Sequence, residues 1–448
     1  MTLIRDLDRA PDLLALHAAQ PQRYPVLLES IASGGGGARF DLLFATTGEA
    51  LVADANGRLS GPHAEGGRFF DALALWHREC AFDATAVDVP FAGGFALLLG
   101  YEIAAEIEPR LRLETNPLAT PQALALRTPV AIVRDRGDGR AYVIAEDAFA
   151  ALFDQACTDA TREFAPVTAL RKVPHIDEEQ ASRYLASVRR ALDYIEAGDV
   201  FQVNLSRAWR ARRPAGLSSA SVYAALRDSN PAPFAGIMQW QDWTLASSSP
   251  ERLISARDGL LQTRPIAGTR PRFAGDDDAS RVRELIGNAK ERAEHIMLID
   301  LERNDLGRVA VPGSVVVDEL MTIESYAHVH HIVSNVRAQL RPGLSPVDAI
   351  RAVFPGGTIT GCPKVRCMQI ISELEGEGRG FYTGALGYLG GDGRMDLNIL
   401  IRSMTLRGEQ IEFRAGAGIV ADSDPQHELD ETRAKARGLL RALQDGSA

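Results

Sequence analysis

The chain has 448 residues, of which 46% are hydrophobic and 24% charged, and its formal net charge at pH 7 is −10. This is an ordinary globular composition, in a chain long enough for one large core or for two domains. The negative charge argues against a nucleic-acid-binding protein, and no stretch reaches the ~18 uninterrupted apolar residues of a membrane span. The N-terminus also lacks the apolar segment of a signal peptide.

The four cysteines, Cys80, Cys157, Cys362 and Cys367, are scattered along the chain, and the one close pair has no second pair of ligands for zinc. We therefore expect reduced thiols in a cytoplasmic protein. Cys80 and Cys157 also lack the glycine-flanked turn of a nucleophile elbow, so the chain shows no glutaminase machinery. Any ammonia taken from glutamine would have to be released by another chain.

The N-terminal third is rich in Ala and Gly, and 130–135 and 141–147 predict a hairpin. A polar, proline-containing connection follows at 166–180. We expect an N-terminal region over 1–165 and a catalytic region over 181–448, packed together into one compact unit.

From residue 181 the periodicity is clearer. Apolar residues recur at helical spacing over 185–195, Gly198 stands where such a helix ends, and 200–209 alternate as a strand with Gln202 and Asn204 on one face. Further strands are predicted at 244–256, 384–390, 397–406 and 410–420, and helices at about 278–304, 363–375 and 425–444. Strands that cluster, rather than alternating strictly with helices, predict an α+β fold with antiparallel sheets.

Two pairs of glutamates carry the strongest chemical signal. Glu291 and Glu294 lie three residues apart on one predicted helix, and Glu428 and Glu431 repeat that spacing on another, with Lys435 one turn later. Two such helices could meet around a hard cation such as Mg²⁺, which takes about six oxygen ligands and keeps several waters. The same spacing is common on solvated helix faces, so an ordinary surface role stays open.

Three other patterns bear on the site. The first of these helices is apolar on nearly all sides from Ile296, which predicts that it enters the interior. The segment 354–364 has glycines at phosphate-loop spacing, but Cys362 and Pro363 follow where Lys and Ser/Thr are needed, which argues against a nucleotide-hydrolysing enzyme. Gly416 and Gly418 would let a carboxylate approach the backbone, although a bulge or close packing would also explain them.

Eight blocks follow one another in order over 181–444. They are GDVFQVNLSR, SSSPERL, RPIAGTRPR, KERAEHIMLIDLERNDLGRV, FPGGTITGCPKVRCMQIISELE, FYTGALGY, LNILIRS and AGAGIVADSDPQHELDETRAKA. Together they resemble the chorismate-utilising enzyme family, which implies an antiparallel β-sandwich flanked by helices in αββα layers. The N-terminal region is similar only through YPVLLESIA at 24–32, which resembles the segment lining the tryptophan pocket of anthranilate synthases, so tryptophan is a further candidate ligand.

The resemblance implies a role for each matching residue. Glu294 and Glu431 would bind Mg²⁺, with Glu291 and Glu428 in support, partly through water. Glu251 would be the general acid at the departing C4 hydroxyl of chorismate, a dianion that an acidic protein can hold only with local cations. The other matching residues of the reacting centre are Gln202, Ala267, Thr269 and His331, and those of the substrate's surroundings are Gly268, Tyr382, Arg402, Gly416, Gly418 and Lys435.

Gln202 separates the reactions of the family. Members that add water, the isochorismate and salicylate synthases, carry a lysine base at this place, whereas ammonia has a free electron pair and needs only a neutral amide. The resemblance therefore implies an amine-transferring member. Anthranilate synthases add ammonia at C2 and eliminate pyruvate, while aminodeoxychorismate synthases deliver the amino group to C4 and keep the enolpyruvyl side chain.

Four positions bear on the choice between these two. Ala267 stands where many aminodeoxychorismate synthases have a lysine that attacks C2, and it leaves room there for ammonia, as in anthranilate synthases. Asn204, the 354–364 segment and residues 230–236 resemble instead the aminodeoxychorismate synthases, a subclass of which carries the alanine and uses two ammonia molecules without a covalent adduct.

We predict the chorismate-binding subunit of an aminodeoxychorismate synthase, acting through noncovalent 2-amino-2-deoxyisochorismate and leading to 4-aminobenzoate and folate. A separate glutaminase subunit would supply the ammonia. The first alternative is anthranilate synthase component I, and the second is an inactive scaffold that only binds chorismate.

Overall fold

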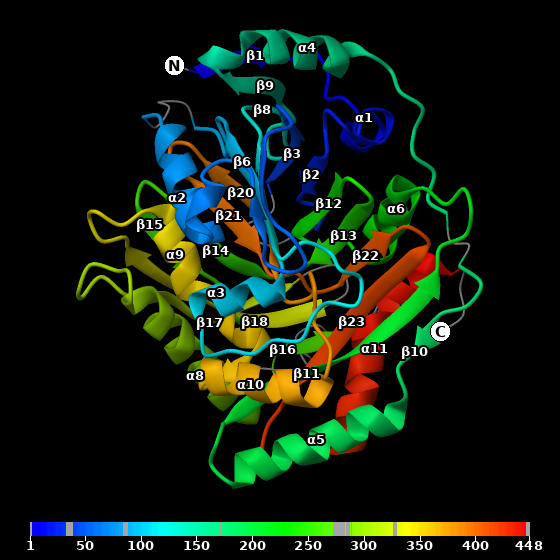
Figure 1. Cartoon of the computed structure of the whole chain (residues 1–448), viewed down its shortest axis with the longest axis vertical. Coiled ribbons are helices and arrows are strands. Elements are labelled where there is room, and N and C mark those ends of the chain that lie inside the picture. Colours follow the sequence, from blue (N-terminus) through cyan, green and yellow to red (C-terminus); the bar gives the residue numbers. More distant parts are fainter. Residues whose placement is uncertain are drawn as a thin grey trace.

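Two large antiparallel sheets stack face to face, and helices cover their outer faces (Figure 1). This computed structural model describes residues 2–32, 39–83, 88–170, 173–271, 283, 287, 289–325 and 329–444. The mixed helix and antiparallel sheet architecture confirms the α+β prediction.

The first sheet combines strands from both ends of the chain. In pairing order they are β1 (Thr2–Asp6), β9 (Ala141–Glu146), β8 (Val130–Asp135), β3 (Phe40–Ala45), β2 (Val26–Glu29), β12 (Phe234–Trp240), β13 (Trp243–Ser249), β22 (Ser403–Arg407), β23 (Gln410–Ile419), β11 (Gln202–Arg212) and β10 (Asp177–Glu178), with β19 (Gly361–Cys362) paired to β11. The predicted hairpin is confirmed as β8 and β9. The N-terminal and C-terminal parts meet where β2 pairs with β12.

The second sheet is shared in the same way. In pairing order its strands are β16 (Ile266–Pro271), β18 (Val329–Gln339), β15 (Leu260–Thr263), β14 (Arg252–Arg257), β21 (Met395–Asn398), β20 (Ala385–Gly390), β6 (Gly94–Leu99), β7 (Ala123–Arg127), β4 (Ala50–Ala53) and β5 (Leu59–Ser60), with β17 (Val316–Ser325) paired to β18. Here β6 pairs with β20. Backbone hydrogen bonds therefore join the two predicted regions in both sheets.

The helices fall into two outer layers. They are α1 (Leu13–Ala19), α2 (Phe69–Glu79), α3 (Ala104–Ile107), α4 (Ala150–Thr161), α5 (Ala181–Glu196), α6 (Ser219–Ser229), α8 (Ala289–Gly307), α9 (Pro346–Val353), α10 (Lys364–Glu375) and α11 (Pro425–Leu443), with a short 3₁₀ turn, η4 (Gly357–Ile359), before α10. The helices α1, α4, α6 and α11 pack on the first sheet, whereas α2, α8 and α9 pack on the second. Among the described residues, no helix combines the length and apolar character needed to cross a membrane.

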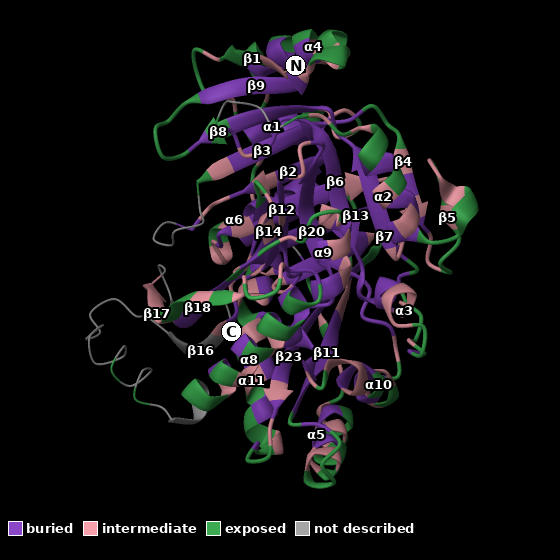
Figure 2. Ribbon diagram, turned by 90° about the vertical axis from the view of Figure 1, so that its left-hand side faces the viewer, coloured by how far each residue is buried: buried purple, intermediate pink, exposed green. Residues whose placement is uncertain are grey.

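Buried apolar residues form three clusters, and much of the ribbon in the strands of both sheets is coloured as buried in Figure 2. Phe44, Leu98 and Met238 belong to the layer between the sheets, and each outer face has its own cluster under the helices. Successive residues of a strand point to opposite faces, so strands with apolar residues on both faces are buried on both sides. This explains why strands such as β6 read as continuous apolar runs.

Two stretches predicted as single strands each supply a strand to both sheets. Residues 244–256 run along the first sheet as β13, leave it at Pro250 and Glu251, and enter the second sheet as β14. Residues 397–406 pass between the sheets as β21 and β22, and Arg402 between them has a φ of 53°. Single-strand predictions were wrong here because the periodicity is the same on both sides of each crossing; proline, which lacks an N–H, and a left-handed residue mark the breaks.

Of the helix predicted over 278–304, the structure gives α8 from Ala289 and helical conformation at Arg283 and Gly287, while residues 272–282, 284–286 and 288 lie outside the described part. Its apolar segment is only partly interior. Leu298 and Ile299 are buried, as expected of a helix that enters the interior, whereas Ile296 is 51% exposed. The helix lies along the rim of the second sheet, with one face against β16 and β18.

Candidate active site

Gln202, on β11, connects α8 to β23. Its Nε2 donates to Glu294 Oε1 at 2.9 Å. Strand β11 pairs with β23 so that Asn204 lies opposite Gly418. A Cβ atom at Gly418 would collide with Gln202 Nε2 and would lie 3.7 Å from Glu294 Oε1. A side chain at this position would therefore displace Gln202 where the carboxylate of α8 approaches the strand.

The second glycine of this strand lies beside α11. Lys435 Nζ donates to the carbonyl oxygen of Gly416 at 2.9 Å and forms an ion pair with Glu431 Oε1 at 2.6 Å. A Cβ atom at Gly416 would lie 2.8 Å from the Tyr382 hydroxyl. Residues two apart on a strand share a face at a spacing of ~7 Å. Two helices far apart in sequence thus bring charged groups to neighbouring points of one strand.

The first turns of α11 carry a cluster of two carboxyl side chains and one imidazole. His427, Glu428 and Glu431 offer ligand atoms that lie within 4.8 Å of one another. Burial raises the pKa of Glu428. Burial acts in the same direction on Glu431, but the charge and hydrogen bond of Lys435 outweigh it and hold the pKa of Glu431 below its usual value. The spacing of the glutamates did not point to His427.

Glu291 lies on α8 one turn before Glu294, but its side chain is outside the described part of the structure. The helix predicted over 425–444 is confirmed as α11, which Asp424 caps by accepting a hydrogen bond from the backbone N–H of His427 at 2.8 Å.

Glu251 lies buried where the chain crosses from β13 to β14. Thr358, on η4, donates its hydroxyl to Glu251 Oε1 at 2.7 Å. Burial raises the pKa of Glu251 to about 7, against the opposing effects of Thr358 and Lys435. A large fraction of the carboxyl therefore holds a proton near neutral pH, as a general acid must. Sequence reasoning missed Thr358, although it lies within the glycine-rich segment compared with a phosphate loop.

Arg402 lies at the other crossing between the sheets. Burial lowers its pKa, while Tyr382 and Glu431 act in the opposite direction, which places both near the guanidinium. The guanidinium of Arg402 donates no hydrogen bond to any of the described residues. Tyr382 is buried beside it. A partly buried cation without a hydrogen-bonded partner is suited to bind a carboxylate from outside the chain.

The predicted alanine motif lies on β16, next to α8. Ala267 pairs with Ile332 and Thr269 with His331, and the ladder is irregular at Gly268, where φ is 65°. The side chains of Ala267 and Thr269 are outside the described part, whereas His331 is buried. The backbone thus brings Thr269 and His331 together as neighbours on adjacent strands.

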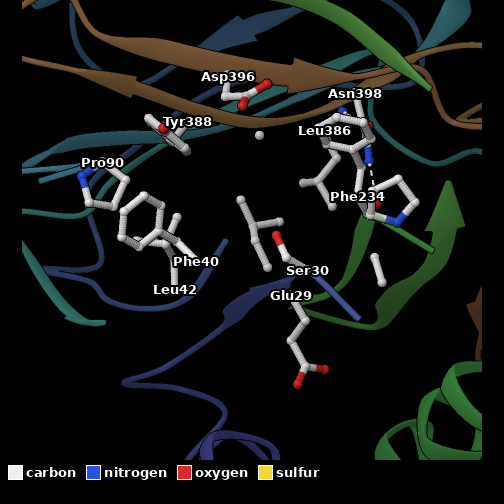
Figure 3. A pocket seen from close by; sticks show the side chains of 14 residues that line it. Glu29, Ser30, Phe40, Leu42, Pro90, Phe234, Leu386, Tyr388, Asp396 and Asn398 are labelled. Carbon is white, nitrogen blue, oxygen red and sulfur yellow. Dashed lines mark hydrogen bonds between the residues drawn. The ribbon is translucent and has the colours of Figure 1, made fainter. Parts of the chain in front are cut away.

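A separate cavity of 80 Å³ lies between the two sheets, lined by residues of β2 and β12 on one side and of β20 and β21 on the other (Figure 3). Leu28 and Ser30 of the segment predicted to line a tryptophan pocket contribute to it, as does Phe234. The carboxylate of Glu29 extends away from the cavity and accepts a hydrogen bond from the Tyr223 hydroxyl at 2.7 Å. Tryptophan as its occupant stays a prediction.

The chain matches the family model described as chorismate binding enzyme over residues 40–441. Aminodeoxychorismate synthase component 1 of Bacillus subtilis is 39% identical over 446 residues, which cover 95% of this chain and 93% of that protein. Anthranilate synthase component 1 of Pseudomonas aeruginosa is 38% identical over 466 residues, which cover 98% and 94%. Relatives with two different activities are therefore about equally similar.

Solved structures agree with this relationship. Anthranilate synthase component I from Streptococcus pneumoniae TIGR4 matches with a TM-score of 0.80 at 31% identity, over 91% of this chain and 93% of that one. The menaquinone-specific isochorismate synthase of Escherichia coli matches with a TM-score of 0.74 at 20% identity, over 99% and 94%, which is a likeness of fold alone.

Proposed function

Because the chain belongs to the chorismate-binding enzyme family, we propose that it is the chorismate-binding subunit of an aminodeoxychorismate synthase. It would convert chorismate and ammonia to 4-amino-4-deoxychorismate, on the way to 4-aminobenzoate and folate. The observation that carries the proposal is the polar face of β11. Gln202 and Asn204 are buried there, and the side-chain oxygens of both lack a hydrogen-bond partner among the described residues.

These two amide oxygens suit ammonia better than water as the nucleophile. Ammonia donates three N–H groups and already carries a free electron pair, so acceptors can orient it without removing a proton. A water nucleophile would need a base, and Gln202 cannot act as one. Asn204, which favours the aminodeoxychorismate synthases, directs its oxygen toward Gly416, because a Cβ atom there would lie 3.0 Å from it.

The chain's own residues would perform the rest of the reaction. Arg402 and Lys435 would hold the two carboxylates of chorismate, with the Tyr382 hydroxyl and the backbone at Gly416 as further contacts. Protonated Glu251 would give its proton to the C4 hydroxyl, which leaves as water while ammonia adds at C2. A second ammonia would then add at C4 as the first leaves C2, so the enolpyruvyl group is kept.

The acidic residues fit Mg²⁺, because carboxylate oxygens are the ligands that this hard cation prefers and Glu428 and Glu431 lie close enough to share one. Glu294 and Glu431 would hold the ion directly, and Glu291 and Glu428 would support it. When bound, Mg²⁺ would neutralise a carboxylate of the substrate. Its arrival would also compete with Lys435 for Glu431.

Ammonia would come from a separate glutaminase subunit, since Cys157 is buried and burial raises the pKa of both Cys80 and Cys157, which disfavours the nucleophilic thiolate. The cavity beside Leu28 and Phe234 would be the place to look for bound tryptophan, by denaturing the purified protein and analysing what is released.

Incubation of the purified chain with chorismate, Mg²⁺ and ammonium would test the proposed reaction. We expect a 4-amino product that retains its enolpyruvyl group, identified by mass spectrometry, and no release of pyruvate. Fluorescent anthranilate together with pyruvate would instead establish the second candidate, anthranilate synthase, which Ala267 favours. A chain that binds chorismate but leaves it unchanged would refute both.

A further inference from the structure

A second cavity, of 370 Å³, is lined mainly by charged side chains and shares no residue with the candidate active site. Its volume lies within the ~300–1,000 Å³ typical of small-molecule sites, whereas one water takes only ~30 Å³. The lining consists of residues 10–14, Glu29 of β2, Asp41 of β3, Arg134 and Arg136 at and just after the end of β8, and Arg227 of α6. The proposed reaction uses none of these residues.

The charged residues continue rows that are apolar elsewhere on the first sheet. Residues two apart on a strand share a face, so Glu29, Asp41 and Arg134 lie on the face of the residues two positions away from them on β2, β3 and β8. Those residues pair with one another and belong to the apolar cluster under the outer helices; they are Leu27, Leu43 and Ile132. Asp41 pairs with Arg134 in the next row of this face. The outer face of the sheet therefore changes from apolar to charged at the cavity.

Two buried carboxylates hold two of the arginines. Arg136 donates from Nε to Asp41 Oδ1 at 2.8 Å and Oδ2 at 2.9 Å, and Arg227 donates from Nη1 to Glu29 Oε1 at 3.1 Å. Asp41 and Glu29 are buried, whereas the side chains of Arg136 and Arg227 are 32% and 31% exposed. A guanidinium has five N–H groups, so most of those on each arginine have no hydrogen-bond partner among the described residues.

Arg134 is a third cation on the wall of this cavity. It is exposed, and it forms no hydrogen bond or ion pair with any residue that the structure describes. Asp41 lies opposite on β3, but its carboxylate accepts from Arg136 and from the backbone N–H of Ser30 at 3.0 Å. The remaining acid of the lining, Asp12, accepts from the backbone N–H of Ala15 at 3.0 Å and so caps α1. The carboxylates of the cavity are therefore engaged elsewhere, and the donors of Arg134 are left unused.

We propose that this cavity binds a small oxyanion, a molecule with a phosphate or carboxylate group, between the guanidinium groups of Arg134, Arg136 and Arg227. A planar guanidinium matches two oxygens of such a group at once. Asp41 and Glu29 fix two of the three forks before a ligand arrives, which lowers the entropic cost of binding. The site is separate from the proposed function, because the two share no residue.

Isothermal titration calorimetry with inorganic phosphate, at constant ionic strength and without Mg²⁺, tests the site. We expect saturable binding of one phosphate, and binding weaker by about tenfold or more in Arg134→Gln. Arg134→Lys, which keeps the charge but not the fork, should lie between the two. The matched control is Arg140→Gln in the β8–β9 hairpin, since Arg140 pairs with Asp6 outside the cavity and its removal should leave phosphate binding unchanged. The same titration with citrate distinguishes the two kinds of ligand, because the tighter of the two anions identifies the favoured group.

Absence of saturable binding of both anions would overturn the proposal, and so would equal phosphate affinity in the wild type and Arg134→Gln. An anion held instead at Arg402 and Lys435 would be displaced by chorismate, so complete displacement would also overturn it, whereas phosphate in this cavity should stay bound. None of these measurements requires turnover. A chain that binds phosphate here but leaves chorismate unchanged would refute the proposed function alone.

Discussion

Glu375 and Glu251 are both buried glutamates, but their surroundings are opposite. Glu375, at the end of α10, accepts hydrogen bonds from Arg379 Nη2 at 2.6 Å, from Arg414 Nη2 at 3.1 Å and from the backbone N–H of Ser206 at 2.8 Å. Although burial opposes them, these arginines hold the pKa of Glu375 below its usual value. Glu251 has one hydroxyl donor, and burial raises its pKa.

This difference in surroundings distinguishes a glutamate suited to a structural role, Glu375, from one suited to proton transfer, Glu251. A buried carboxylate surrounded by cations stays charged and fixes its neighbours in place, whereas one left without cations keeps its proton and can give it away. Glu302 belongs with Glu251 in this respect. Arg414 of this network lies on β23, two residues before Gly416, so the charged network and the candidate site share a strand.

The largest effect on activity is expected for Glu251→Gln. A neutral amide resembles the protonated carboxyl in shape but cannot give up a proton, so chorismate consumption should fall by about 10²- to 10⁴-fold. The measurement is kcat with saturating ammonium and Mg²⁺. Thermal stability at acidic pH should stay close to that of the wild type, and an active Glu251→Gln enzyme would remove Glu251 from the mechanism.

For Glu375→Gln we expect the reverse, a loss of stability. Removing the carboxylate takes from the buried Arg379 the glutamate that it pairs with and leaves Arg414 with Glu377 alone, which should lower the free energy of unfolding by ~3–5 kcal/mol. Denaturant titration would measure it. A matched control is Glu373→Gln on the same helix, because Glu373 is exposed and interacts with Tyr194 rather than with an arginine. If both variants unfold at the same denaturant concentration, the network does not stabilise the fold.

Gly418→Ala tests the contact between the two regions. The new methyl group would displace the Gln202 side chain and disturb its hydrogen bond to Glu294, so we expect about a tenfold loss of kcat/KM. Gly307→Ala is the control, since a Cβ atom there meets nothing within 4 Å. A Gly418→Ala enzyme with wild-type kinetics would mean that the Gln202–Glu294 contact is dispensable.

The smallest expected effect is on stability at alkaline pH. The folded protein holds protons on Glu251 and Glu302 up to pH values of about 7 and about 8, whereas the unfolded chain releases both at ordinary carboxyl values. Their contribution is fully present at acidic pH and is lost as the pH rises through these values. Between about pH 6 and about pH 9, the Tm of the wild type should therefore fall by a few degrees more than that of a Glu251→Gln, Glu302→Gln double variant. Parallel Tm curves would contradict both raised pKa values.

Short-range patterns predicted much of the fold. The helix α11 with its Asp424 cap, the β8–β9 hairpin and the strand alternation at Gln202 all depend on residues close together in sequence. The family was also predicted correctly, because its eight blocks keep their order. The two crossings between sheets were not predicted, since alternation reads the same on either side of a crossing.

The site was predicted only for residues that can be recognised in the sequence by their type and spacing. Acidic pairs and glycines can be found along the sequence, whereas Thr358 becomes relevant only because it contacts Glu251, 107 residues away. His427 was overlooked because it lies beside the glutamate pattern rather than in it. Glu302 stands in a charged stretch, LERND, that looks like an exposed helix face, and only the packing of α8 on η4 buries it.

The sharing of both sheets has a consequence for how the chain is made. Strands β2 and β6 leave the ribosome with open edges, and their partners β12 and β20 are synthesised more than a hundred residues later. Non-local pairing of this kind folds slowly and leaves the nascent chain prone to aggregation. A truncated version starting at residue 181 would carry the reacting groups on two sheets that each lack a neighbour, so expression of the catalytic half alone should give insoluble protein.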